Sequence, residues 1–213
     1  MARSLADVAR ANALFGGTSA ALVELGRVLD RIDQRSASVL DVGTGAADIP
    51  LNARSAAARR GITLEMVAIE RSEVLAQRAA RAGIPTARSD ALRLPFADDS
   101  IDVVMCSQLL HHFVERSRAL DVLRELHRVA RRAVIVSDLR RSWLAVAGIW
   151  LASFPLRFHP VSRHDGVTSV LRGYTLSELR ELVQAATGCV PMVRAHRGFR
   201  TTAVWWPRGG ACA

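Results

Sequence analysis

Residues 39–48 read VLDVGTGAAD, and this short stretch decides the fold class. Its first four residues form an apolar run interrupted only by Asp41, which is typical of a buried β-strand. At Gly43 and Gly45 a backbone without Cβ atoms can turn tightly and approach a ligand. The helix expected from Asp48 onwards would present its N-terminus there, and helix N-termini favour anionic or hydrogen-bonding groups. A lone Gly-x-Gly pair also occurs in turns that bind nothing, so the surrounding residues must decide.

From this stretch onwards, short β-like runs alternate with longer runs of helical periodicity. The pattern predicts strands at 38–42, 63–69, 85–88, 101–107 and 133–137, helices at 48–60, 72–82, 115–131 and 175–186, and a terminal hairpin of 190–195 and 201–206. Helices are also expected within residues 4–33. Such alternation is typical of parallel βαβ units in one sheet with helices on both faces, so the predicted fold class is α/β.

Residues 139–174 interrupt this alternation after the fifth strand. They contain an uncharged, mostly apolar run from Trp143 to Leu156, followed by Pro160 and a polar segment. We predict a helical, lid-like insertion over the carboxyl edge of the sheet, with Trp143 or Trp150 approaching a bound acceptor. A helix that is apolar on all sides is typical of a core helix, of a cover over an apolar substrate or of contact with lipid. The sequence leaves these alternatives open.

We expect one domain over residues 1–213. Its parts would be N-terminal helices (1–37), a ligand-binding core (38–138), the insertion (139–174), and a C-terminal helix with a hairpin (175–206). Half of the 213 residues are apolar. A chain of this size buries roughly two-thirds or more of its unfolded surface, so it needs no disulfide or metal to fold.

The charge is strongly positive, with 29 basic residues, all of them arginine, against 20 acidic ones and a net charge of +9. The arginines are scattered, and aromatic residues make up only 5% of the chain. Nucleic-acid-binding surfaces have basic stripes with interleaved aromatics, so nucleic acid is not an expected partner. The charge favours a solvated, arginine-rich surface, with anionic ligands or peripheral contact with a membrane as further expectations.

Neither a signal peptide nor a membrane span is expected. The chain does not open with a charged n-region and an apolar h-region. Its longest apolar run, Trp143–Leu156, has 14 residues, too few for a bilayer of about 30 Å. The three cysteines, Cys106, Cys189 and Cys212, are far apart and unpatterned, which favours reduced thiols. We therefore expect a cytoplasmic protein.

Acidic residues fall at the ends of three consecutive predicted strands. Asp41 lies beneath the glycine turn, Glu70 ends the second strand, and Asp90 follows the third. In an open α/β sheet these carboxyl ends form the ligand crevice. There Asp41 suits a cationic amine, Glu70 can accept from both hydroxyls of a ribose, and Asp90 can accept from an adenine amine. Asp48 stands at the third glycine position of the dinucleotide fingerprint, which argues against NAD or FAD.

Residues 38–138 resemble the class I S-adenosylmethionine-dependent methyltransferases of the small-molecule type. The resemblance is carried by the glycine turn, the acidic strand ends, the run from residue 94 to 104 and the segment 107–113. Ala47 departs from the family pattern, which often has a third glycine there. The resemblance implies a Rossmann-like, seven-stranded, mostly parallel sheet with a reversed last strand, and S-adenosylmethionine as methyl donor. The cofactor-binding residues that it implies are Asp41, Gly43, Thr44, Gly45, Glu70, Arg71, Asp90, Ala91 and Ser107.

Methyl transfer is an in-line displacement that needs proximity and orientation, and a hydroxyl acceptor profits from a general base. The candidate bases are His111, just past the fourth strand, and His164, beside Asp165 in the insertion. These histidines could instead only order the loops, and His112 is a further candidate. Candidate acceptor contacts are Trp143, Trp150, Arg163, Arg172 and Tyr174. No His or Cys spacing typical of a metal site occurs, so no metal is expected.

The predicted function is methyl transfer to an apolar small molecule, by O-methylation of a phenol, a quinol or a polyketide. One alternative is a methyltransferase-like protein that binds the cofactor without turnover. Another is an RNA or protein methyltransferase. Residues 107–110 read SQLL where base N-methylating enzymes have an Asn-Pro-Pro-Tyr type of motif, which argues against base methylation. The sequence does not predict an oligomeric state.

Overall fold

The computed structural model describes residues 16–152 and 160–208. The helices in these ranges are α2 (Gly17–Ile32), α3 (Asp48–Ala58), α4 (Glu73–Arg81), α5 (Arg116–Val129), α6 (Trp143–Ala152), α7 (Pro160–Arg172) and α8 (Leu176–Thr187), with a 3-10 turn, η1 (Leu110–His112). The strands are β1 (Ser36–Val42), β2 (Thr63–Glu70), β3 (Thr86–Arg88), β4 (Ile101–Ser107), β5 (Ala130–Leu139), β6 (Met192–His196) and β7 (Arg200–Trp205).

One sheet holds all seven of these strands in the order β3-β2-β1-β4-β5-β7-β6. Strands β1 to β5 pair in parallel, and β7 pairs antiparallel with both β5 and β6. The predicted α/β fold, with a seven-stranded, mostly parallel sheet and a reversed last strand, is therefore confirmed. The strand order changes direction between β1 and β4, and ligands of open α/β sheets bind at the carboxyl ends beside such a point.

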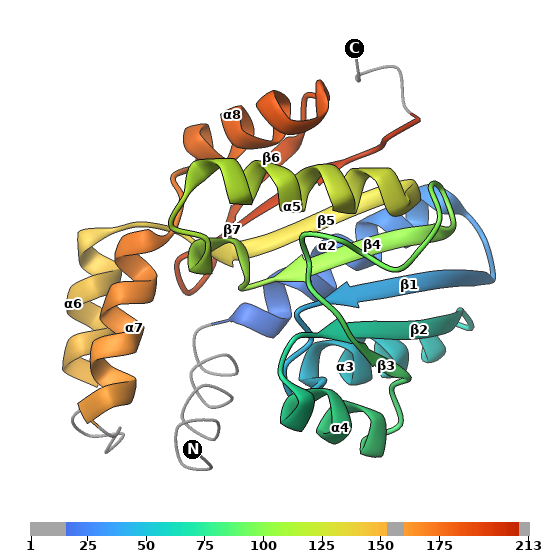
Figure 1. Ribbon diagram of the computed structural model, residues 1–213, viewed down its shortest axis with the longest axis horizontal. Coiled ribbons are helices and arrows are strands. Elements are labelled where there is room, and N and C mark those ends of the chain that lie inside the picture. Colours follow the sequence, from blue (N-terminus) through green and yellow to red (C-terminus); the bar gives the residue numbers. More distant parts are fainter. Residues whose placement is uncertain (1–15, 153–159, 209–213) are drawn as a thin grey trace.

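Helices cover both faces of the sheet (Figure 1). Helices α5 and α8 pack on one face through a cluster that includes Leu123, Leu126 and Leu182, while α2 and α3 pack on the other. Every residue of β4 is buried, as expected for a central strand that is covered on both sides. The two apolar layers fix the carboxyl ends of β1 and β4 side by side.

Strand β5 begins three residues before its predicted start at Ala133. The predicted strand left out Arg131 and Arg132, which precede its apolar run. In the structure both guanidinium groups reach the carboxylate of Asp102, at 3.1 and 3.3 Å. The Asp102 carboxylate also accepts hydrogen bonds from the backbone N–H and the hydroxyl of Ser38. These partners let two arginines stand inside the strand.

The insertion forms α6 and α7, which lie side by side beyond the carboxyl end of β5 (Figure 1). Its two ends are tied together, because Tyr174 N–H donates to the Leu139 carbonyl and Arg141 N–H donates to the Tyr174 carbonyl. Trp143 is 80% exposed, so α6 is not a core helix. None of the described helices is long and apolar enough to cross a membrane.

The cysteines differ in part from the expectation. Cys106 is a free thiol buried in β4. Cys189 is disulfide-bonded, so the expectation of reduced thiols is wrong for this residue. Sequence spacing alone carries no information on which thiols a fold brings together.

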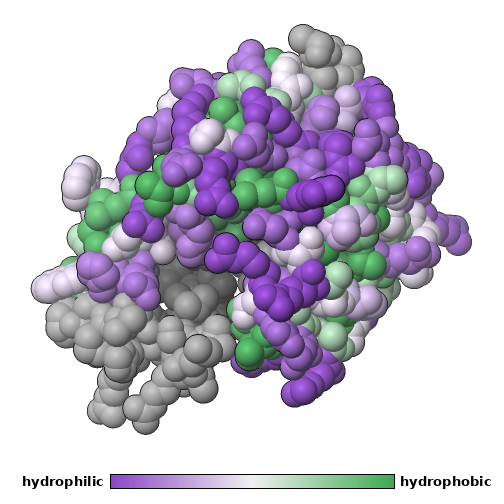
Figure 2. All heavy atoms as spheres, in the orientation of Figure 1, coloured by the Kyte–Doolittle hydropathy of each residue, from purple (hydrophilic) through white to green (hydrophobic). Residues whose placement is uncertain are grey.

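Hydrophilic residues predominate on the face shown in Figure 2, and hydrophobic ones form separate patches between them. Such a surface is typical of a solvated globular chain. This surface agrees with the scattered positions of the arginines in the sequence.

Candidate functional site

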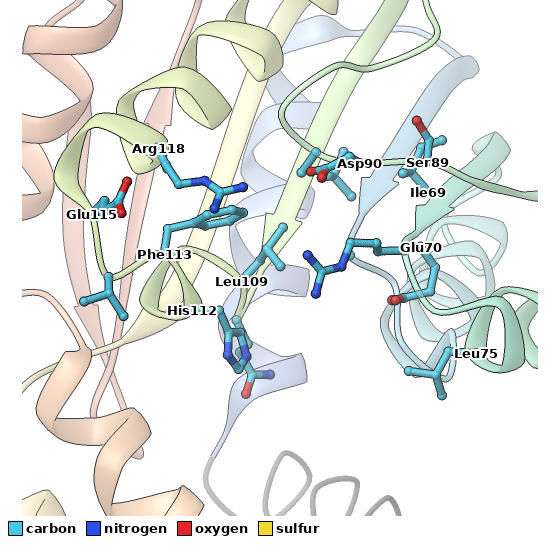
Figure 3. A pocket seen from close by; sticks show the side chains of 16 residues that line it. Ile69, Glu70, Leu75, Ser89, Asp90, Leu109, His112, Phe113, Glu115 and Arg118 are labelled. Carbon is cyan, nitrogen blue, oxygen red and sulfur yellow. The ribbon is translucent and has the colours of Figure 1, made fainter.

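A cavity of about 620 Å³ opens at the carboxyl ends of β1, β2 and β4. We call it the strand-end crevice. Figure 3 shows Glu70, Ser89 and Asp90 on one side and Leu109, His112 and Phe113 on the other. Its lining residues are Val42, Gly43, Ile69, Glu70, Arg71, Leu75, Ser89, Asp90, Ala91, Gln108, Leu109, His112, Phe113, Val114, Glu115 and Arg118.

The glycine turn after β1 forms the floor of this crevice. Gly43 has a φ of 76° and Gly45 a φ of 58°, both in the left-handed region that favours glycine. A Cβ on Gly43 would lie 3.1 Å from a methyl group of Leu109, so a side chain there would require Leu109 to shift by a few tenths of an ångström. Ala47, where the family pattern often has a third glycine, is also left-handed at 64°.

Glu70 connects the turn to the second strand end. One of its carboxylate oxygens accepts from the backbone N–H of Gly45 at 3.0 Å, and the other accepts from that of Ser72 at 2.9 Å. Across the sheet edge, Asp90 accepts from the backbone N–H of Leu92. Both carboxylates therefore have fixed orientations and line the crevice, as the sequence predicted.

Asp41 lies beneath the turn rather than on the crevice wall. Its side chain is only 2% exposed. Burial raises the pKa of Asp41 to about 7; the nearby Asp48 and Glu70 carboxylates raise it further and Thr44 opposes them. A carboxylate so far from water would be stabilised by a nearby cation, and the interaction of Asp41 with an amine, directly or through water, stays a prediction.

The predicted cofactor residues thus fall into two groups. Gly43, Glu70, Arg71, Asp90 and Ala91 line the strand-end crevice. Asp41, Thr44, Gly45 and Ser107 are not among its lining residues. The hydroxyls of Ser107 and of its cross-strand neighbour Ser137 are buried without a hydrogen-bond partner. Buried polar groups of this kind commonly bind an ordered water.

The crevice fits an adenosine-containing cofactor. Glu70 and Asp90 provide acceptors for hydroxyl and amine donors, and Ile69, Leu109 and Phe113 provide apolar walls for a base. A volume of about 620 Å³ lies within the range typical of small-molecule sites.

Replacing Glu70 with alanine is expected to weaken binding of S-adenosylhomocysteine by about 10–150-fold, the scale of a lost charge-assisted hydrogen bond. Isothermal calorimetry measures this directly. Glu73→Ala is a matched control, because Glu73 pairs with Arg88 on the exposed face of α4. Equal affinities of wild type and Glu70→Ala would contradict this role for Glu70.

The sequence missed most of the wall that follows β4. Gln108, Phe113, Glu115 and Arg118 line the crevice, and so does His112. Gln108 has a φ of 55° and accepts from the buried guanidinium of Arg200 at 3.0 Å. Burial lowers the pKa of Arg200 to about 10, with Asp138 acting in the opposite direction. The signal that could have found Gln108 was its place directly after a central strand.

His111 is buried and pairs with Asp138, which is fully buried at the end of β5. The ring Nδ1 lies 2.6 Å from one oxygen of Asp138, and the backbone N–H of His111 donates to the other. Burial acts to raise the pKa of Asp138, but the charge and hydrogen bonds of His111 and the Leu139 N–H outweigh it and hold that pKa below its usual value. Asp138 can accept a hydrogen bond from a proton-bearing Nδ1 of His111, and in a neutral ring of that tautomer Nε2 is the acceptor.

A second cavity, of about 270 Å³, shares Phe113 and Val114 with the strand-end crevice. We call it the arginine cavity. Its lining residues are His111, Phe113, Val114, Arg116, Arg141, Arg172, Tyr174, Glu178 and Leu182. The predicted base and the predicted acceptor contact Tyr174 therefore meet in one place.

Other predicted residues lie elsewhere. His164 is exposed on α7 and lines neither cavity, and Asp165 beside it is also exposed. Trp143 and Trp150, 80% and 49% exposed, also line neither cavity. An all-apolar helix gives no indication of which face packs inward. The side chain of Arg163 lies outside the described residues. In the described part of the chain, no three His, Cys, Asp or Glu side chains are placed to hold a metal ion.

Comparison with known proteins agrees with this geometry. Residues 40–136 match a family model described as a methyltransferase domain.

Solved structures with the same fold include a SAM-dependent methyltransferase from Aquifex aeolicus (18% identity, 85% of this chain and 88% of that one, TM-score 0.58). Another is a SAM-dependent methyltransferase from Thermotoga maritima described as a possible histamine N-methyltransferase (14%, 95% of both chains, 0.62). A third is magnesium protoporphyrin IX methyltransferase from Synechocystis with bound SAM (13%, 90% and 79%, 0.59). The chain thus contains a match to a methyltransferase domain over residues 40–136 and has the fold of S-adenosylmethionine-dependent methyltransferases, and the comparisons support S-adenosylmethionine as its methyl donor.

Proposed function

We propose that this methyltransferase acts on a hydroxyl group of a small phenolic molecule. The observation that carries the proposal is the His111–Asp138 pair, whose histidine lines a cavity that shares residues with the strand-end crevice. Residues such as Phe113, Val114 and Leu182 give that cavity apolar surface for an aromatic ring. Acceptor and donor would then meet where the two cavities share Phe113 and Val114.

The bound cofactor supplies an activated methyl group; the chain supplies orientation and a path for one proton. A phenol has a pKa of about 10, so it is protonated at neutral pH and is a poor nucleophile. Nε2 of His111 can accept the phenolic proton, and Asp138 stabilises the imidazolium that forms. His111 is then the general base and Asp138 its positioning residue.

The experiment is a methyl-transfer assay with S-adenosylmethionine and a panel of phenols, quinols, amines and thiols. Mass spectrometry detects the added methyl group, and the amount of S-adenosylhomocysteine formed measures turnover. We expect transfer to phenolic oxygen. Transfer to amines alone, or cofactor binding without turnover on any acceptor, would support the alternatives instead.

A secondary proposal is that α6 makes peripheral contact with a membrane through its two tryptophans. Trp143 and Trp150 are exposed beside Leu144 and Leu151 on a chain with a net charge of +9. Aromatic and positively charged residues together favour an anionic lipid surface. Sedimentation with anionic vesicles, compared with neutral vesicles, tests this contact.

A further inference from the structure

The arginine cavity brings together basic side chains from three separate segments. Arg116 begins α5, Arg141 precedes α6, and Arg172 ends α7. Arg141 forms an ion pair with Glu178. The side chains of Arg116 and Arg172 make no hydrogen bond or ion pair with any residue in the described ranges. The cavity thus has two uncompensated positive charges close to the buried His111.

The charges of Arg116 and Arg172 shift the pKa values of neighbouring side chains in the cavity. Burial raises the pKa of Tyr174 to about 12, and the Arg116 charge opposes this. Burial and the charge of His111 lower the pKa of His112, and Arg172 lowers it further. Both guanidinium groups therefore lie near enough to influence the groups on which a substrate would rest. A cleft lined by one sign of charge concentrates ligands of the opposite sign.

The residue types that line the arginine cavity favour one class of anion over others. A planar guanidinium binds a planar carboxylate through two parallel hydrogen bonds. The apolar side chains of Phe113, Val114 and Leu182 share the cavity, and they suit a ring rather than a bare inorganic ion. Tyr174 keeps its phenolic proton and donates to the Leu110 carbonyl at 3.4 Å, a length that leaves the hydroxyl free to turn to a better acceptor.

We propose that the acceptor is a hydroxy-substituted aromatic carboxylate, whose carboxylate is bound by Arg172 and Arg116 and whose hydroxyl faces His111. This inference rests on the proposed function and names the substrate class of the same site. It modifies the expectation of a purely apolar acceptor, because two unpaired arginine side chains favour an acceptor that carries a carboxylate. The carboxylate would also orient the ring, so only one hydroxyl position can approach His111.

The test compares binding of 2-, 3- and 4-hydroxybenzoate with binding of their methyl esters, in protein saturated with S-adenosylhomocysteine. The expected preference for at least one acid over its ester is about 10–100-fold, the scale of charge-assisted hydrogen bonds. Arg172→Gln and Arg116→Gln should each reduce that preference at least several-fold. Affinity for the ester should stay nearly unchanged. Arg124→Gln is the matched control, because Arg124 pairs with Asp121 on the exposed face of α5.

Binding and turnover separate the two hypotheses. An acid preference that both cavity arginines support, without methyl transfer, would contradict hydroxyl methylation and leave the anion site standing. Equal binding of acids and esters, or a preference that neither arginine variant changes, would overturn the anion site even if phenols are methylated. Weaker acid binding at high salt, with unchanged ester binding, would further support it.

Discussion

Replacing His111 with glutamine is expected to lower the turnover number for a phenolic acceptor by about 10²–10⁴-fold, the usual contribution of a general base. Glutamine can keep a hydrogen bond to Asp138, but it cannot take a proton. Cofactor affinity should change little, because His111 lines the arginine cavity and not the strand-end crevice. Steady-state kinetics with separate binding of S-adenosylhomocysteine measures both quantities.

Two further measurements make the result specific. His164→Gln is the matched control, since this histidine is exposed and lines neither cavity. The turnover number of this variant should fall less than about threefold. The His111→Gln activity should recover as the pH approaches the phenol pKa of about 10, because the phenolate then forms without a base. A loss below tenfold with an unchanged pH profile would falsify the general-base role and leave proximity as the source of catalysis.

Replacing Asp41 with asparagine is expected to make the cofactor-free protein markedly more stable above pH 7. In the unfolded chain this carboxyl titrates near 3.8, whereas burial raises its pKa to about 7 in the folded protein. Between these values the folded chain holds one more proton than the unfolded chain. The stability contributed by the neutral carboxyl is therefore complete below about pH 4 and is lost as the pH rises through 7.

About three pKa units correspond to about 4 kcal/mol, at 1.36 kcal/mol per unit. Asparagine cannot ionise, so the difference in unfolding free energy between the variant and wild type should grow by about 2–3 kcal/mol from pH 5 to pH 8. Urea denaturation at several pH values measures it. The control is Asp121→Asn, at a half-exposed residue paired with Arg124, and it should show no such trend. A pH-independent difference for Asp41→Asn would mean that the buried carboxyl does not titrate in this range.

A gain in stability of this kind would support the proposal that Asp41 is kept for binding. A buried acid near two other carboxylates destabilises the empty protein, and a cationic ligand would remove that cost. The same variant should therefore bind the cofactor more weakly than wild type. A stabilised protein with unchanged cofactor affinity would argue against the predicted interaction with an amine.

The sequence by itself determined the fold class and the floor of the cofactor site. Glycine at 43 and 45 is a local requirement of the backbone, because both positions have positive φ. The strand-end acids Glu70 and Asp90 were also predictable, because parallel strands bring their carboxyl ends to one edge of a sheet. These features depend on neighbours in the chain or on one general rule of sheet topology.

Only the tertiary structure decided which residues form the proposed acceptor site. His111 and Asp138 are 27 residues apart and meet because the register pairs Ser107 with Ser137 at the ends of β4 and β5. Sequence reasoning named His111 as a candidate base but could not name its partner, and the one His–Asp pair that it proposed was the adjacent His164 and Asp165.

The two arginines of the acceptor side depend on the fold in the same way. Arg172 and Arg116 line the same cavity because the insertion returns to the end of β5, where Arg140 pairs with Tyr174. The direction of α6 was equally hidden, because a helix with apolar residues all round carries no signal for which face is buried. Contacts between distant segments depend on strand register and helix packing, and no local pattern of residues records either.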